Sequence, residues 1–213
     1  MVRLGGERVA ILKVARLGHP VLRQVAPPVK PESIQEAETQ RLIDDMIETM
    51  REYDGIGIAA PQVHVSKQIA VIEAKGNRRY PDAPDIPLTV LINPEVTPLG
   101  PELEDDWEGC LSLNDFRGLT PRYQKVRAKA LDREGHPIDF VATGFHARVL
   151  QHERDHLLGK VFIDRMPSFE TLSYLPEFTR YWSRYAPPLS RRSARHFPCT
   201  TTNALSGASL RGA

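Results

Sequence analysis

The sequence predicts a single α+β domain in which mostly antiparallel strands pack around one central helix. Two segments have the apolar period of a helix, one near the start of the chain and one after residue 143. The segments between them are short and have the patterns of strands, which is typical of an α+β fold. The chain has 213 residues, the size of one domain with a tail.

The first helix is predicted from Ser33 to about Tyr53, on the outside of the domain. Ser33 and Glu36 have the spacing of a capping box, which would satisfy free backbone N–H groups at the helix start. Asp54 and Gly55 follow and are typical of a helix end. The apolar residues with helical spacing are Ile34, Leu42, Ile43, Met46, Ile47 and Met50.

Four strands are predicted between the two helices, over residues 68–73, 89–93, 125–132 and 137–143. The first two are apolar runs, and Pro94 is expected to end the second because proline cannot donate to a sheet. The third alternates apolar and polar residues, and the fourth returns after a turn as its partner. Residues 76–87 contain three prolines, so we expect a surface loop there.

The second helix is predicted over residues 144–158, with Gly159 as its C-cap. The end of the chain differs in composition, because residues 186–213 contain four arginines and no acidic residue. Such a segment has little apolar surface to bury. We therefore expect one folded domain over residues 1–185, followed by a disordered basic tail.

Charge and composition exclude several classes of protein. Lys and Arg number 28 against 27 for Asp and Glu, so no broad basic surface for DNA is expected. No apolar run approaches the roughly 18 residues of a transmembrane helix, and the first residues lack the apolar centre of a secretory signal. The two cysteines are too few for a disulfide scaffold. We therefore expect a cytoplasmic protein with no DNA or membrane partner.

The strongest chemical signal is the pair His152 and His156 inside the second predicted helix. Residues four apart lie on one face of a helix, so both imidazoles can reach one metal ion. Glu153 is adjacent to the first histidine and can reach a water molecule on that metal. The pattern indicates a metal-assisted hydrolase, and the alternative is two ordinary helix histidines.

A catalytic metal site of this kind needs a third protein ligand and an open position for water. Cys110 is one candidate, because a thiolate binds borderline and soft divalent metals strongly. Other histidines and the carboxylates are also candidates, and a free cysteine is usually a small buried apolar residue. The residue pattern alone leaves these alternatives open.

Residues 55–62, with the sequence Gly-Ile-Gly-Ile-Ala-Ala-Pro-Gln, are rich in small side chains. Small residues allow a backbone to approach another group closely. The segment lacks the Gly-Lys-Ser/Thr of a phosphate loop and the spacing of a dinucleotide fingerprint. It predicts a close approach, with Gln62 as a polar group in apolar surroundings.

Together the three motifs resemble those of the peptide deformylase family. That family carries Gly-x-Gly-x-Ala-Ala-x-Gln, Glu-Gly-Cys-x-Ser and Gln-His-Glu-x-Asp-His in this order, and this sequence contains them at residues 55–62, 108–112 and 151–156. The likeness runs from about residue 14 to residue 167. It implies metal-dependent hydrolysis of the N-formyl group from the N-terminal formylmethionine of newly made polypeptides, with release of formate.

The resemblance also implies roles for individual residues. The metal ligands would be Cys110, His152 and His156. Glu153 would take a proton from water and deliver it to the leaving amine. Gln62 and the backbone N–H of Leu111 would bind the oxyanion that develops on the formyl oxygen. Fe²⁺ would be the working metal, with Zn²⁺, Ni²⁺ or Co²⁺ as possible substitutes.

The substrate would be an N-formyl-methionyl nascent peptide, so a transient contact with the ribosome is expected. We also expect the enzyme to be a monomer. Gly57 would make a backbone contact to the peptide. Ile56, Phe145 and Val149 would line the methionine pocket, and the alternative for these three is ordinary core packing.

Three features leave the interpretation open. Arg117 and Arg122 stand where the family has arginines, and either contact substrate or are surface or salt-bridge residues. Leu113 and Asn114 follow Ser112 where many relatives have a proline, which affects substrate preference. The alternative functions are a metallopeptidase and a non-catalytic peptide- or ribosome-binding relative.

Overall fold

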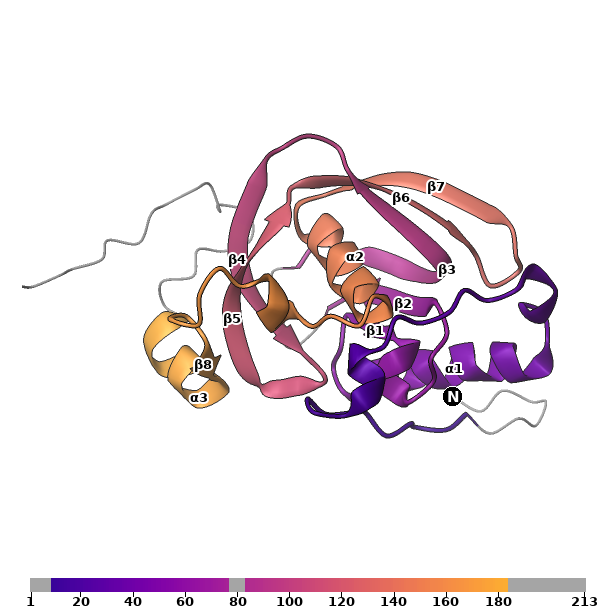
Figure 1. Ribbon diagram of the computed structural model, residues 1–213, viewed down its shortest axis with the longest axis horizontal. Helices are drawn as coiled ribbons and strands as arrows, with labels where there is room; N and C mark the ends of the chain where they lie inside the picture. Colours follow the sequence, from indigo (N-terminus) through magenta and orange to yellow (C-terminus); the bar gives the residue numbers. More distant parts are fainter. Residues whose placement is uncertain (1–8, 77–82, 184–213) are drawn as a thin grey trace, which may run out of the picture.

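A five-stranded antiparallel sheet forms one half of the fold. Figure 1 shows the computed structural model, which describes residues 9–76 and 83–183. The strand order is β1-β2-β3-β6-β7, so the chain leaves this sheet after β3 and returns to it at β6. The strands are β1 (Gly57–Ala59), β2 (Ile69–Ala74), β3 (Ile86–Pro98), β6 (Lys125–Leu131) and β7 (Pro137–Thr143).

A three-stranded sheet lies beside the first. Two of its strands come from the part of the chain between β3 and β6, and the third comes from later in the chain. Its order is β4-β5-β8, with β4 (Leu103–Cys110), β5 (Leu113–Tyr123) and β8 (Ser173–Tyr174). β4 and β5 pair antiparallel, with Cys110 opposite Leu113 at the closed end of the hairpin. The tight connection therefore fixes the position of Cys110.

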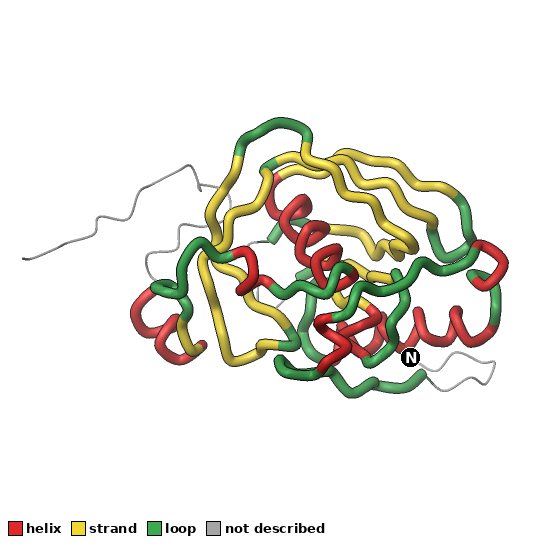
Figure 2. The backbone as a smooth tube through the Cα atoms, viewed as in Figure 1, coloured by secondary structure: helices red, strands yellow, loops and turns green. Residues whose placement is uncertain are grey.

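The helix α2 (Gly144–Leu157) lies at the centre of the molecule, with strands of both sheets around it (Figures 1 and 2). Its buried apolar side chains pack against those of β2, β3 and β6. This arrangement confirms the predicted α+β class with antiparallel strands around a central helix. Short elements complete the chain: η1 (Pro20–Arg23), η2 (Pro31–Ser33), η3 (Ala60–Val63), η4 (Phe162–Arg165), α3 (Leu175–Glu177) and the π-helical turn η5 (Phe178–Trp182).

The other long helix, α1 (Ala37–Glu52), begins later than predicted. Ser33 lies in η2, and no capping box forms because the residue before the helix is Glu36. The carbonyl of Ile34 instead accepts a hydrogen bond from the side-chain Nε2 of Gln40 at 2.8 Å. The predicted apolar face is correct: four of its residues are buried against β1, β2 and β3, namely Ile43, Met46, Ile47 and Met50.

The strand β3 does not stop at Pro94, as the sequence predicted, but continues to Pro98. Its pairing with β6 shifts register between Ile92 and Glu95, where Asn93 has a left-handed backbone with φ of 53°. A bulge of this kind takes the proline out of the hydrogen-bonded ladder, so the strand can continue past it.

The remaining elements differ in how well local pattern predicted them. β2, β6, β7 and α2 agree with their predicted ranges to within a residue at each end, and Gly159 has the left-handed φ of a C-cap at 70°. β5 was not predicted, since Gly118 and Pro121 interrupt its pattern. The expected loop over 76–87 is described only in part, because residues 77–82 lie outside the described residues and β3 begins at Ile86. The predicted tail also lies outside them.

Among the described residues, no helix combines the length and the apolar character that crossing a membrane requires.

Candidate metal centre and active site

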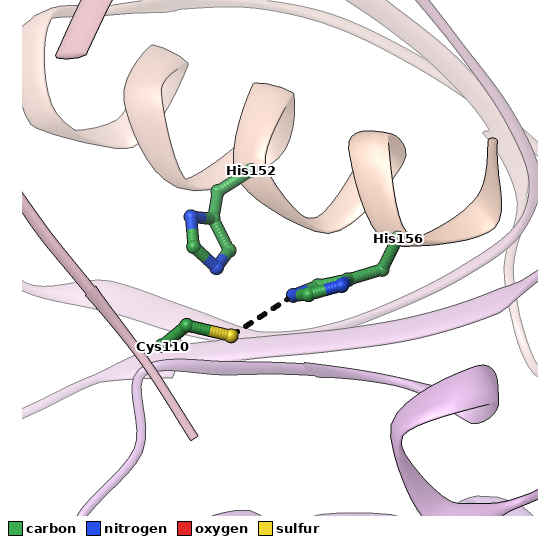
Figure 3. Close-up of side chains that lie close together, drawn as sticks. All are labelled: Cys110, His152 and His156. Atoms are coloured by element: carbon green, nitrogen blue, oxygen red, sulfur yellow. Dashed lines mark hydrogen bonds between the residues drawn. The ribbon is translucent and has the colours of Figure 1, made fainter. Parts of the chain in front are cut away.

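Three side chains that can bind a metal meet where α2 passes the end of β4. His152 and His156 lie one turn apart on α2, and Cys110 ends β4. Their ligand atoms all lie within 4.8 Å of one another, and Cys110 Sγ is 3.3 Å from His156 Nε2 (Figure 3). Within the described ranges this is the only cluster of three or more Cys, His, Asp or Glu side chains with such spacing.

The donor set fits a divalent transition metal. Burial opposes ionisation of the Cys110 thiol, but the neighbouring His156 and His152 hold its pKa well below the usual range. The backbone N–H of Ser112 also points at Sγ, at 3.4 Å. A thiolate with two imidazole nitrogens is a ligand set that zinc and iron accept, and it leaves a position free for water.

Glu108 orients the first histidine. Its Oε2 lies 2.8 Å from Nδ1 of His152, so the other ring nitrogen is left to act as the metal ligand. Sequence reasoning did not identify this role. The available signal was spacing, since Glu108 stands two residues before Cys110 and such residues project to one side of a regular strand.

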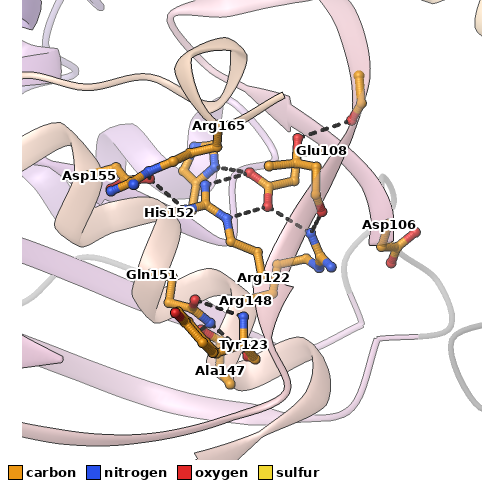
Figure 4. A network of polar contacts seen from close by, with 12 residues as sticks. Asp106, Glu108, Arg122, Tyr123, Ala147, Arg148, Gln151, His152, Asp155 and Arg165 are labelled. Carbon is orange, nitrogen blue, oxygen red and sulfur yellow. Dashed lines mark hydrogen bonds and ion pairs between the residues drawn. The ribbon is translucent and has the colours of Figure 1, made fainter. Parts of the chain in front are cut away.

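Behind the histidines, arginines surround two buried carboxylates (Figure 4). Arg122 donates to both oxygens of Glu108, at 2.8 and 2.9 Å, and to Asp155 at 2.5 Å. Arg148 donates to Glu108 at 2.8 Å, and Arg165 to Asp155 at 2.5 Å. Burial would raise the pKa of each carboxyl group, but the arginines lower both. The network joins β4, β5 and α2, and so fixes the metal ligands relative to one another.

The two arginines noted in the sequence are both buried, so neither is a surface residue. Arg122 is a salt-bridge residue, as described. Arg117 packs beneath the cysteine loop, where its Nη1 donates to the carbonyl of Phe116 at 2.7 Å. A Cβ on Gly109 would lie 2.4 Å from the same Nη1, so this glycine is needed for the close contact.

Glu153 is 4% exposed and lies against the backbone of β1. A Cβ on Gly57 would lie 2.3 Å from Glu153 Oε1, so the glycine that the sequence marked for a close approach makes it with this carboxylate. Burial raises the pKa of Glu153 to about 7, against the opposing effect of the histidines. Its Oε2 is buried and has no hydrogen-bond partner among the described residues, and Glu153 borders the cleft described below.

Gln62 is 1% exposed and is held by its own loop, because its Oε1 accepts a hydrogen bond from the backbone N–H of Ala59 at 2.9 Å. That bond leaves the amide Nε2 facing the metal ligands, 3.5 Å from Cys110 Sγ. Leu111 follows the cysteine, and its carbonyl accepts from Arg16 Nη1 at 3.2 Å. Gln62 and Leu111, the residues predicted to provide the oxyanion donors, therefore both border the cleft beside the cysteine.

A cleft opens beside the histidines, and the remaining predicted residues line it. Ile56 lines it from the turn before β1 and Gly57 from β1 itself, and Phe145 and Val149 line it from α2. Gln62, Leu111, Cys110, His152 and Glu153 also border this cleft. Trp107 and Arg148 line it too, and sequence reasoning did not select them.

Comparison with known proteins agrees with this geometry. The family model described as Polypeptide deformylase matches residues 11–171. The chain belongs to the polypeptide deformylase family. Peptide deformylase 2 of Pseudomonas putida is 44% identical over 164 residues, which are 77% of this chain and 92% of that deformylase. Peptide deformylase 1 of Bordetella pertussis is 46% identical over 161 residues, or 76% and 90% of the two chains.

Solved deformylase structures have the same fold. A class I type b peptide deformylase from Acinetobacter baumannii, bound to Met-Ala-Ser, has a TM-score of 0.72 and 40% identity, covering 75% of this chain and 100% of its own. A peptide deformylase from Synechococcus elongatus in complex with actinonin has a TM-score of 0.67 and 34% identity, covering 88% and 97%. The resemblance inferred from the three motifs is therefore confirmed.

Proposed function

We propose that this deformylase works through a divalent metal ion held by Cys110, His152 and His156, with Glu153 as the residue that transfers protons. The enzyme removes the N-formyl group from the N-terminal formylmethionine of new polypeptides and releases formate. The observation that supports the proposed roles is the meeting of one thiolate, two imidazoles and a buried carboxylate beside one cleft.

The chain's own residues divide the chemistry among them. A bound metal supplies a Lewis acid and lowers the pKa of water towards 7. Glu153 takes a proton from the attacking water and passes it to the leaving amine. Gln62 Nε2 and the backbone N–H of Leu111 donate to the formyl oxygen as negative charge develops on it.

The substrate binds as an extended peptide along the edge of the larger sheet. β1 is an edge strand of the larger sheet, and its buried residue Gly57 lines the cleft. A peptide added there gains backbone hydrogen bonds, while its first side chain enters a neighbouring pocket. Ile56, Phe145 and Val149 provide apolar walls of a kind suited to methionine.

The decisive experiment compares formate release from a formyl-Met peptide with hydrolysis of the acetyl-Met peptide and of internal peptide bonds. Wild-type protein should act on the formyl peptide alone. Glu153→Ala should keep its metal and its fold but lose nearly all activity. Activity above about a tenth of wild type at normal metal content would exclude the proton-transfer role, and cleavage of internal bonds would favour the metallopeptidase alternative.

For the metal we propose Fe²⁺, which the family resemblance favours. The thiolate and imidazole set is borderline in softness, so Zn²⁺, Ni²⁺ and Co²⁺ should bind as well. Peroxide formed near iron can oxidise Cys110 to sulfenic or sulfinic acid, whereas zinc has no redox chemistry. Reconstitution without air should give a faster iron form that loses activity in air. A zinc form at least as fast, or an iron form that survives peroxide, would overturn the assignment.

We also propose that the enzyme acts in the cytoplasm as a monomer and meets the ribosome only transiently. A thiolate ligand is best preserved in a reducing compartment. All the proposed site residues come from one chain, so no second copy is needed to complete the site. Sedimentation of the purified protein alone would test the monomeric state, and a stable dimer would contradict it. Sedimentation with ribosomes would test the transient contact.

A further inference from the structure

The C-terminal segment of the described chain packs against a residue of the active-site cleft. Phe178 and Trp182 belong to η5, beyond residue 171 where the family match ends. Their rings lie 4.8 Å and 5.4 Å from the ring of Trp107, centroid to centroid. Trp107 is 8% exposed and lines the cleft. A part of the chain outside the family match therefore supports one wall of the site.

The segment is attached to the smaller sheet at its start. β8 pairs with β5 through Phe116 opposite Tyr174, and the rings of these two residues lie 4.7 Å apart. Figure 1 shows β8 and α3 together beside β5. The strand pairing and the three aromatic contacts together attach the segment to β4 and β5.

The position of Trp107 indicates which part of a substrate it meets. It stands three residues before Cys110 on β4, and a strand advances about 3.3 Å per residue, so it lies about 10 Å from the metal ligand along the strand. An extended peptide covers the same distance in about three residues. A peptide that binds along β1 with its formyl group at Cys110, and that extends through the cleft towards Trp107, would bring its second or third residue there. The predicted methionine pocket is lined by other residues of the same cleft, namely Ile56, Phe145 and Val149.

We propose that Phe178 and Trp182 are positioning residues that hold Trp107 as the contact for the second and third residues of the peptide substrate. This inference rests on the proposed function, because it requires a peptide in the cleft. Without the rings behind it, the Trp107 side chain can turn away, and the peptide loses an ordered apolar surface. The effect should fall on binding of longer peptides and not on the chemical step.

Kinetics with the full-length, metal-loaded enzyme provide the first test. The substrates are formyl-methionyl-alanine and formyl-methionyl-alanyl-leucyl-leucine. Phe178→Ala and Trp182→Ala should each raise KM for the tetrapeptide about 3- to 10-fold, the scale of one aromatic contact. Their kcat values and their KM for the dipeptide should stay within about twofold of wild type. Trp182→Phe should restore the tetrapeptide KM because it keeps a ring.

The matched control is Tyr181→Ala, on the same segment, since Tyr181 is 53% exposed. It should leave both KM values unchanged. Equal KM changes in Tyr181→Ala and Trp182→Ala, or an equal loss of kcat on both substrates, would overturn the proposal. Wild-type formate release is measured in the same assay, so a failure of the proposed function would be seen separately.

Fluorescence gives a readout that does not depend on turnover. The chain has two tryptophans, and both belong to this cluster. In Trp182→Phe combined with Glu153→Gln, Trp107 is the single tryptophan and the formyl peptide is not consumed. Its emission should change on titration with the tetrapeptide and much less with the dipeptide. The same response to both peptides, or no response to either at saturation, would place Trp107 away from the substrate.

Discussion

At the scale of single residues, Gly57 shows how closely the site is packed. The carboxylate of Glu153 occupies the space that any side chain at position 57 would need, since a Cβ there would lie 2.3 Å from Oε1. The φ of Gly57 is not in the left-handed region, so a substitution tests this contact without backbone strain. Gly57 is therefore required by the placement of Glu153, whereas a Cβ on Gly55 would crowd Leu111 and Met50 instead.

We expect Gly57→Ala to lower kcat at least about 10-fold while metal content stays at the wild-type level. The added methyl group displaces Glu153, and a shift of about 1 Å in a catalytic group can cost about 100-fold in rate. Formate release and metal analysis on the same preparation measure both quantities. Gly76→Ala is the control: nothing lies within 4 Å of a Cβ there, but its φ of 56° disfavours alanine, so the variant should lose stability and keep the wild-type kcat. A Gly57→Ala enzyme with wild-type kcat would show that Glu153 does not depend on this contact.

Glu108 is important for the stability of the fold, because its buried carboxylate neutralises the charge of buried arginines. It accepts hydrogen bonds from Arg122 and Arg148 and contacts His152. Glu108→Gln should lower the free energy of unfolding by about 3–5 kcal/mol, the cost of leaving a buried charge uncompensated. Metal affinity should fall about 10- to 100-fold as His152 loses its orienting partner. Denaturant unfolding and a competitive metal titration measure these effects.

The control for Glu108 is an exposed ion pair. Arg127 and Asp139 pair at 2.7 Å with side chains 49% and 42% exposed. Arg127→Ala should lower the free energy of unfolding far less than Glu108→Gln does, since solvent screens such pairs. If the two substitutions lowered the free energy of unfolding equally, burial of the Glu108 network would not explain the loss of stability in Glu108→Gln.

At the scale of elements, the sequence predicted what local pattern determines. The alternating residues of β6 and the helical period of α2 are local features, and both elements appear where they were expected. The start of α1 and the path of β3 depend on distant partners. Asn93 forms hydrogen bonds with Val29, which is 64 residues away, and it lies in the bulge that lets β3 continue past Pro94. A contact over this distance cannot be predicted from the local sequence.

Asn93 should therefore be sensitive to substitution. Its Oδ1 accepts from the N–H of Val29, and its Nδ2 donates to the carbonyl of Val29, each at 2.8 Å. Asn93→Ala should lower the free energy of unfolding by about 2–4 kcal/mol, from two lost hydrogen bonds and from a left-handed φ that alanine disfavours. Asn93→Gly should be about 1 kcal/mol less destabilising, because glycine accepts this φ. Equal losses in the two variants would mean that the backbone conformation contributes nothing.

At the scale of the whole molecule, the site could be recognised from the sequence only in part. Spacing alone identified His152 and His156, whereas Cys110 was one candidate among several until the motifs were considered together. The charge network could not be predicted from the sequence, because Glu108, Arg122 and Asp155 come from β4, β5 and α2 and meet only when these three elements pack together. Side-chain pairs of this kind are fixed by tertiary structure and leave no periodic signal.

The boundary of the functional molecule can be tested by two deletions. Deletion of residues 186–213 should leave formate release unchanged and Tm within about 2 °C, because the sequence predicts little buried surface there. Deletion of residues 172–213 also removes β8 and the rings that pack on Trp107, so Tm should fall by about 4 °C or more and KM for the tetrapeptide should rise. Calorimetry and the two-substrate assay distinguish these results. A fall in Tm of more than about 4 °C in the shorter deletion would show that residues beyond 185 pack on the domain, and the domain boundary would then have to move towards the C-terminus.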